Sequence, residues 1–138
     1  MWIELVRSRA LTFTNVKGSS SLEQLLSEAL ASADWESATL VVRVEQCTIG
    51  TDATLTFQAY AEWPDESELR TIYVETTPMG TPISLGSTAT SPALHRALLF
   101  DNHDAGTPLL RITAKATQPA TPVTVQVTVS VGLVVHGR

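Results

Sequence analysis

Cysteine is nearly absent from this chain, since Cys47 is the only one among 138 residues. A single cysteine excludes an intramolecular disulfide, and it excludes the structural zinc sites that require several clustered thiolates. Cys47 ends an apolar run, and no Lys, Arg or His stands beside it in the sequence to lower its pKa. We therefore interpret it as a structural side chain, and we expect the protein to be made in the cytoplasm.

Basic residues are also scarce. Nine Lys and Arg stand against fourteen Asp and Glu, which gives a formal net charge of -5 at pH 7. Nucleic-acid binding depends on Lys and Arg that neutralise phosphates, so a DNA or RNA partner is disfavoured. The first seven residues contain no basic segment followed by a long apolar run. We therefore expect neither a secretory signal nor a membrane-spanning helix.

The sequence lacks the patterns that mark common active sites. It contains no Gly-x-Ser-x-Gly elbow, no Gly-x-Gly-x-x-Gly turn and no P-loop, and its histidines, His95, His103 and His136, have no positional signature. The acidic residues at 62–68 surround a proline, which is typical of a solvated surface loop. We predict that the protein is not an enzyme and that it needs no cofactor.

Alternation of apolar and polar residues is the strongest positive signal. Valine occupies positions 123, 125, 127, 129 and 131, while Thr, Gln and Ser occupy the positions between them. A period of two residues predicts a strand with one buried face. The hydrophobic fraction of 43% and the charged fraction of 17% are ordinary for a globular protein, so we expect one domain over residues 1–138.

Further alternating runs predict the remaining strands. Residues 110–116 precede the valine strand across a Pro-containing turn, and residues 40–44 precede a similar run at 55–61, so we predict two β-hairpins. At the start of the chain, residues 2–6 and 10–16 indicate two strands around a polar turn. Shorter strands are expected at 69–76 and 82–86, whereas 92–98 fits either a helical turn or part of a strand.

One segment has a different period. Leucine or alanine recurs at positions 22, 25, 26, 29 and 30, which is helical spacing, and Ser20 with Glu23 forms a capping box. This pattern predicts a helix over residues 21–32, and the alternative is a loop that packs its leucines under a sheet. About eight strands with one short helix indicate an all-β, antiparallel, jelly-roll-like β-sandwich, because a parallel sheet would need a crossover helix after almost every strand.

Two clusters suggest ligand binding. Asp101, His103 and Asp104 are potential metal ligands, but they lack the spacing of a calcium loop and are residues that tight turns prefer. We therefore favour a turn and predict no metal site. Trp63, with Tyr60 and Tyr73, is a candidate aromatic platform for a saccharide. A carbohydrate- or ligand-binding module is accordingly the alternative function.

The order of these runs resembles small β-sandwich proteins from the structural gene regions of tailed phages. The resemblance rests on a Leu-x-Val-x-Val strand at 38–44, the run at 109–114 and the closing Thr/Val strand at 123–135. The leucine segment at 22–30 and the acidic loop at 62–68 depart from it. Proteins of this kind are decoration, head-tail or tail accessory components, so the resemblance implies a non-enzymatic structural role and a place in a virion or phage-like particle.

Assembly of such a protein requires contact surfaces. Sheet edges and flat sheet faces let identical copies associate, and apolar residues near the two ends of the sequence are suited either to dock on a neighbour or to complete the protein's own sheet. These interface candidates are Trp2, Ile3, Leu5, Leu133, Val134 and Val135. We predict a homo-oligomer or a subunit of a larger protein shell, with no nucleic-acid and no membrane partner.

Overall fold

The computed structural model describes residues 1–16, 21–27, 30–32, 34–65, 72–101, 109–117 and 123–137, with side chains described at all of these except 15–16, 21–22, 62–65 and 72–77. Nine strands and no helix occur among these residues. The first five are β1 (Trp2–Val16), β2 (Ser21–Leu25), β3 (Leu30–Ala31), β4 (Trp35–Ile49) and β5 (Thr54–Asp65). The last four are β6 (Ile72–Leu85), β7 (Ala93–Phe100), β8 (Leu109–Thr117) and β9 (Val123–Gly137).

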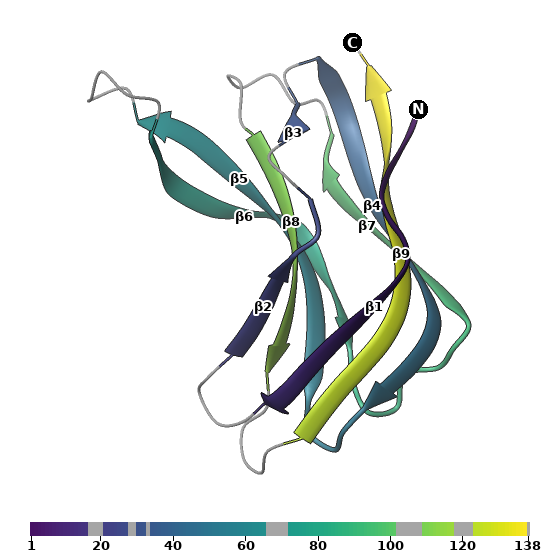
Figure 1. Ribbon diagram of the computed structural model, residues 1–138. Helices are drawn as coiled ribbons and strands as arrows, with labels where there is room; N and C mark the ends of the chain where they lie inside the picture. Colours follow the sequence, from purple (N-terminus) through teal and green to yellow (C-terminus); the bar gives the residue numbers. More distant parts are fainter. Residues whose placement is uncertain are drawn as a thin grey trace.

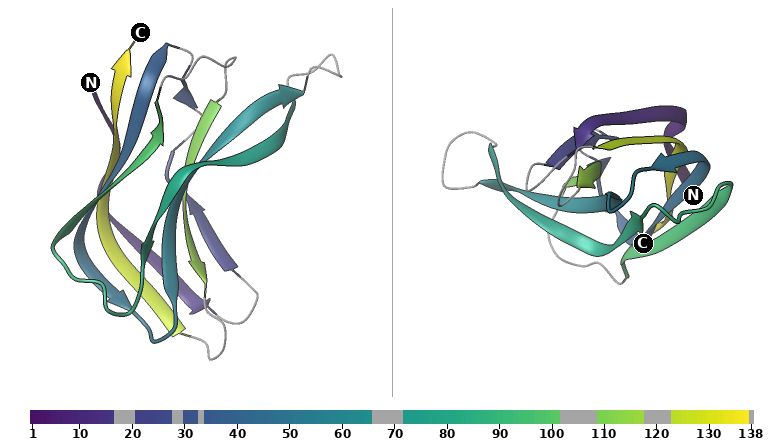
Figure 2. Two further views of the ribbon diagram at one scale, coloured as in Figure 1. Left: turned by 180° about the vertical axis from the view of Figure 1, so that it is seen from behind. Right: turned by 90° about the horizontal axis from the view of Figure 1, so that it is seen from below.

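The strands form two antiparallel sheets that stack face to face (Figures 1 and 2). One sheet has the order β1-β9-β4-β7, and the other has the order β2-β8-β5-β6, with β3 also paired to β8. Pairing is nested along the chain: β1 pairs with β9, β2 with β8, β4 with β7 and β5 with β6. A long ribbon of nested pairs rolled into two sheets is a jelly roll, so the predicted all-β, jelly-roll-like sandwich is confirmed at this level.

The two sheets share one hydrophobic core. Alternate residues of β9, including Val125, Val129 and Val131, are fully buried, as the period of two predicts. They pack with residues from the opposite sheet such as Phe57 and Ile112, which are also fully buried. The other face of each sheet is left outside the core, and it is the outer face of the β1-β9-β4-β7 sheet that carries the surface described below.

The two predicted hairpins are wrong, although all four of their strands exist. β4 lies in one sheet and β5 in the other, and β8 and β9 are separated in the same way. Each connection therefore crosses from one sheet to the other and does not join two paired strands. Alternation shows that a segment is a strand with one buried face, but it does not identify the strand with which that segment pairs.

The helix predicted for residues 21–32 is also wrong. β2 pairs with β8 from Ser21 opposite Thr117 to Leu25 opposite Thr113. Leu25 is 44% exposed and Leu26 is 4% exposed, whereas a helix would place these two leucines on one face. Ser20, the first residue of the expected capping box, lies outside the described residues.

Hydrogen bonds to β8 explain why this segment is extended. The backbone N–H of Leu26 donates to the carbonyl oxygen of Ile112 at 2.8 Å, and the N–H of Ile112 donates to Oγ of Ser27 at 3.1 Å. A strand that pairs with β8 satisfies backbone groups of both segments, and this tertiary gain outweighs the weak local preference for a helix.

The strand boundaries differ from the prediction in two places, at β1 and at β6. β1 is one strand, not two, and its polar turn is an irregularity at Ser8, which has a positive φ of 44°. β6 runs continuously through Pro78 and Pro82, which is possible because β6 lies at a sheet edge. The undecided segment 92–98 contributes most of β7.

Candidate interaction surface

The six interface candidates lie together in the β1–β9 ladder. Trp2 is opposite Val134 and Ile3 is opposite Leu133. The amino group of Met1 donates to the carbonyl oxygen of Val135 at 2.8 Å, and the N–H of Val135 donates to the carbonyl oxygen of Met1 at 2.9 Å. The two ends of the chain thus complete the protein's own sheet (Figure 1).

The six candidates differ in exposure: some are buried, some are half-buried and one is exposed. Leu133 and Val135 are 0% and 1% exposed and belong to the core, so they are held inside the subunit itself. Ile3, Leu5 and Val134 are half-buried. Trp2 is 52% exposed, and it is the member of the group whose side chain is most available to a partner. The role of the group in an interface remains a prediction.

Trp2 lies across the outer face of the sheet. A Cβ atom at Gly132 would lie 2.3 Å from Cη2 and 2.4 Å from Cζ2 of the Trp2 indole. The absence of a side chain at Gly132 therefore lets the indole rest on β9. Val41, the neighbour of Gly132 on β4, is only 9% exposed although it is outside the core cluster. Side chains on the outer face therefore cover it.

Other apolar side chains gather on the same face. Of the five large hydrophobic side chains exposed in the described part of the chain, Leu94 and Leu98 are on β7 and are each 54% exposed. Ala97 and Leu99 between and beside them are buried in the core, so alternation places the two exposed leucines on the outer face. Together with Trp2 they place exposed apolar side chains on both edge strands of the sheet, β1 and β7.

The register of the ladders arranges this surface in rows. The first row, from β1 to β7, is Trp2, Val134, Thr39 and Leu98. The second row is Glu4, Gly132, Val41 and Arg96. A third row contains Ser130, Arg43 and Leu94 on β9, β4 and β7. We call these three rows the outer-sheet face.

Charged groups of both signs border the apolar part of the outer-sheet face. Nε of Arg7 lies 2.8 Å from Oε1 of Glu4, and their side chains are 79% and 39% exposed. This is the one ion pair recorded among the described residues, and so exposed a pair contributes little to stability. Arg43 and Arg96, on the β4 and β7 side, are exposed.

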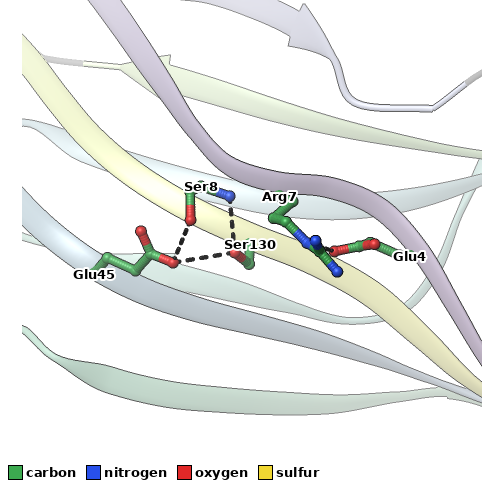
Figure 3. Close-up of polar contacts among 5 residues, drawn as sticks. All are labelled: Glu4, Arg7, Ser8, Glu45 and Ser130. Carbon is green, nitrogen blue, oxygen red and sulfur yellow. Dashed lines mark hydrogen bonds and ion pairs between the residues drawn. The ribbon is translucent and has the colours of Figure 1, made fainter.

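A hydrogen-bonded cluster anchors the irregular part of β1 to the sheet (Figure 3). Oε1 of Glu45 accepts hydrogen bonds from Oγ of Ser8 at 2.8 Å and from Oγ of Ser130 at 3.2 Å. The backbone N–H of Ser8 donates to Oγ of Ser130 at 2.9 Å. These bonds hold Ser8 in its left-handed conformation and place a carboxylate beside the arginine-bearing part of the face.

A groove of about 420 Å³ runs over this region. Its apolar wall consists of Trp2, Val41 and Leu94, and its polar residues include Arg43 and Glu45. The arrangement offers apolar contact area with charged groups of both signs around it, which is the composition of a protein contact surface.

The sequence pointed to Trp2 on this surface but not to Leu94 and Leu98, nor to Glu4 and Arg96, which stand at the two ends of the second row. The signal that could have revealed this face was the alternation of Leu94, Arg96 and Leu98. Because Ala97 and Leu99 are apolar as well, both faces of β7 look hydrophobic in the sequence, and the strand was not distinguishable from a helical turn.

The two ligand-binding clusters gain no support from the described residues. Asp101 is exposed, and His103 and Asp104 lie outside the described residues. Within the described ranges no three His, Cys, Asp or Glu side chains are close enough to hold a metal ion. Tyr60 is half-buried, while the side chains of Trp63 and Tyr73 are outside the description, so the aromatic platform remains a prediction.

Two titratable groups in the described part of the chain have shifted pKa values. Burial raises the pKa of the Cys47 thiol, which packs against the core and remains half-buried. Burial, and secondly the negative charge of Glu23, raise the pKa of Tyr60. A raised thiol pKa lowers the fraction of reactive thiolate at neutral pH, which accords with a structural cysteine.

The described residues include no helix long and apolar enough to cross a membrane. No protein-family model and no curated protein matches the chain.

Two solved structures are similar in fold. The VP2 subviral particle of infectious bursal disease virus matches 99% of this chain and 32% of its own chain, with a TM-score of 0.60 and 10% identity. The structure of the Gt strain of the same virus matches 96% of this chain and 32% of its own, with a TM-score of 0.52 and 10% identity. The protein thus spans about a third of the length of these chains, and what it shares with this viral structural protein is the β-sandwich fold.

Proposed function

We propose that the protein is a non-enzymatic structural component of a virus-like particle and that it acts by binding further copies of itself. The observation that carries the proposal is the nested strand pairing from β1–β9 to β5–β6, which closes a jelly roll. Jelly rolls are frequent in viral capsid domains, and the structural neighbours come from a viral particle.

The physical properties of the surface support self-association. An exposed tryptophan and two exposed leucines share one sheet face, and groups of such side chains on a soluble protein mark interaction sites. A flat sheet face can pack against an identical face without any change in the fold. The protein would be located in the particle that it helps to build, as one domain of 138 residues.

The tailed-phage role belongs to this proposal as its more specific form. It rests on the Leu-x-Val-x-Val and Thr/Val strands of the sequence, whereas the structural neighbours come from a virus that is not a tailed phage. The jelly roll supports a structural role in either kind of particle, as a decoration, head-tail or tail accessory protein.

Electron microscopy of the purified, concentrated protein tests the proposal. Rings, shells or other closed assemblies of uniform size are the expected result, because symmetric self-association closes. A field of single subunits at every concentration, with no binding to a preformed particle from the same source, would contradict it.

A further inference from the structure

The side chains on the β1 edge of the outer-sheet face are complementary to those on its β7 edge. The first row begins with Trp2 on β1 and ends with Leu98 on β7, so both ends are apolar. The second row begins with the carboxylate of Glu4 and ends with the guanidinium of Arg96, so its ends have opposite charges. The middle of the second row is apolar or without a side chain, at Val41 and Gly132.

The distance across the sheet prevents these partners from meeting within one subunit. Neighbouring strands are about 4.8 Å apart, so β1 and β7 are separated by about 14 Å over the three intervals of the sheet. Glu4 instead contacts Arg7 of its own strand through an exposed pair. Arg96 therefore presents its charge outward, beside the exposed Leu94 and Leu98.

We propose that a second copy of this chain docks on the outer-sheet face, related by a two-fold axis that runs along the strands between β9 and β4. Such an axis places β1 over β7 of the second copy and β9 over its β4, with each row facing the same row. Trp2 then contacts Leu98 of the second copy, and Glu4 pairs with its Arg96. Symmetry makes each contact twice.

The remaining groups of the face agree with this arrangement. In the third row, Arg43 faces Ser130 of the second copy, and the hydroxyl of Ser130 donates a hydrogen bond to Glu45. Gly132 and Val41 lie at the centre, where the Trp2 indole covers Gly132 and adds apolar surface toward the second copy. Packed sheets whose strands are nearly aligned are a common arrangement in β-proteins.

This inference rests on the proposed self-association and adds the surface, the symmetry and the residue pairs. The variants Glu4→Lys and Arg96→Glu test it by sedimentation velocity and native mass spectrometry of the full chain. Each variant alone opposes like charges across the axis, twice per dimer, and we expect dimer association to weaken by about tenfold or more. Glu23→Lys, an exposed charge change on β2 of the other sheet, is the matched control and should leave association unchanged.

Mixing the two variants gives the decisive result. In a mixed dimer, Lys at position 4 of one chain faces Glu at position 96 of the other, and the unchanged Glu4 and Arg96 face each other as well. The mixture should therefore regain association close to that of the wild type. Circular dichroism and the urea midpoint of each variant check that the fold is intact, as expected for exposed charges.

Three results would overturn the inference. The first is association that is unaffected by either variant, and if large assemblies still form, the proposed function stands and only this surface is wrong. The second is a mixture that remains as weak as the single variants. The third is a wild type that stays monomeric while saccharides alter its tryptophan fluorescence, since the ligand-binding function would then be favoured. Conversely, charge-dependent dimers that never grow larger would support the surface and contradict the particle role.

Discussion

At the scale of single residues, Gly132 controls how the N-terminal strand lies on the sheet. A Cβ atom there would be 2.7 Å from the carbonyl oxygen of Ile3 as well as close to the Trp2 indole. The indole is exposed and can move, but the backbone of Ile3 is fixed by its pairing with Leu133. Gly132 is therefore required both for the apolar surface and for the β1–β9 ladder.

Replacement of Gly132 tests this requirement. We expect Gly132→Ala to lower the free energy of unfolding by about 1–3 kcal/mol, since overpacking forces the backbone to shift. Gly86→Ala is the matched control, because nothing lies within 4 Å of a Cβ at Gly86, and its effect should stay within about 0.5 kcal/mol. Urea denaturation measures both, and equal effects of the two substitutions would refute the role of Gly132.

Tyr60 is expected to make the free energy of unfolding decrease at alkaline pH. Burial favours its neutral form, so its pKa in the folded protein lies above the ordinary value of 10.0. The unfolded chain therefore loses this proton first, and the stabilisation is complete below pH 10.0 and is lost as pH rises through the raised pKa. Tyr60→Phe should weaken the decline in unfolding free energy above that pH, measured by urea titration at several pH values. The same decline in both proteins would show that Tyr60 does not contribute.

At the scale of elements, the strands were more predictable than their partners. The alternation in β9 was sufficient to identify a half-buried strand, because its side chains face either core or solvent. Pairing depends on residues distant in sequence, and among the nine described strands only β5 and β6 are consecutive partners. Local reasoning therefore joined β4 to β5 and β8 to β9, which lie in different sheets.

The same limitation applies to the candidate surface. Trp2 was recognisable as a large apolar residue near an end of the chain, whereas Leu133 and Val135 looked equivalent to it but are buried. Their difference arises from the face of β9 on which each residue lies. The register that aligns β7 with β4 and β9 places Leu98 and Arg96 on the candidate surface. No local sequence pattern contains that register.

β2 offers a direct test of strand against helix. Leu26 is 4% exposed and its neighbour Leu25 is 44% exposed, as alternation in an extended chain requires. Leu26→Ala should lower the free energy of unfolding by about 2–4 kcal/mol through the cavity that it leaves. Leu25→Ala should change it by less than about 0.5 kcal/mol. Chemical denaturation of both variants is the measurement, and comparable losses would favour the helix, which buries the two side chains together.

At the scale of the whole molecule, the inner and outer faces of the sheets have different roles. Their inner faces form the core that stabilises the jelly roll, and the outer face of the β1-β9-β4-β7 sheet remains available for contact. The chain has a formal net charge of -5, yet the outer-sheet face contains charges of both signs. In the proposed dimer, this local balance allows identical copies to approach in spite of their overall repulsion.

The mass of the protein in solution, measured by light scattering behind a sizing column over a range of concentrations, tests self-association most directly. We expect a multiple of the 14.9 kDa chain mass that falls on dilution or reaches the fixed mass of a closed oligomer. A mass of 14.9 kDa at every concentration, with and without chelator, would contradict it.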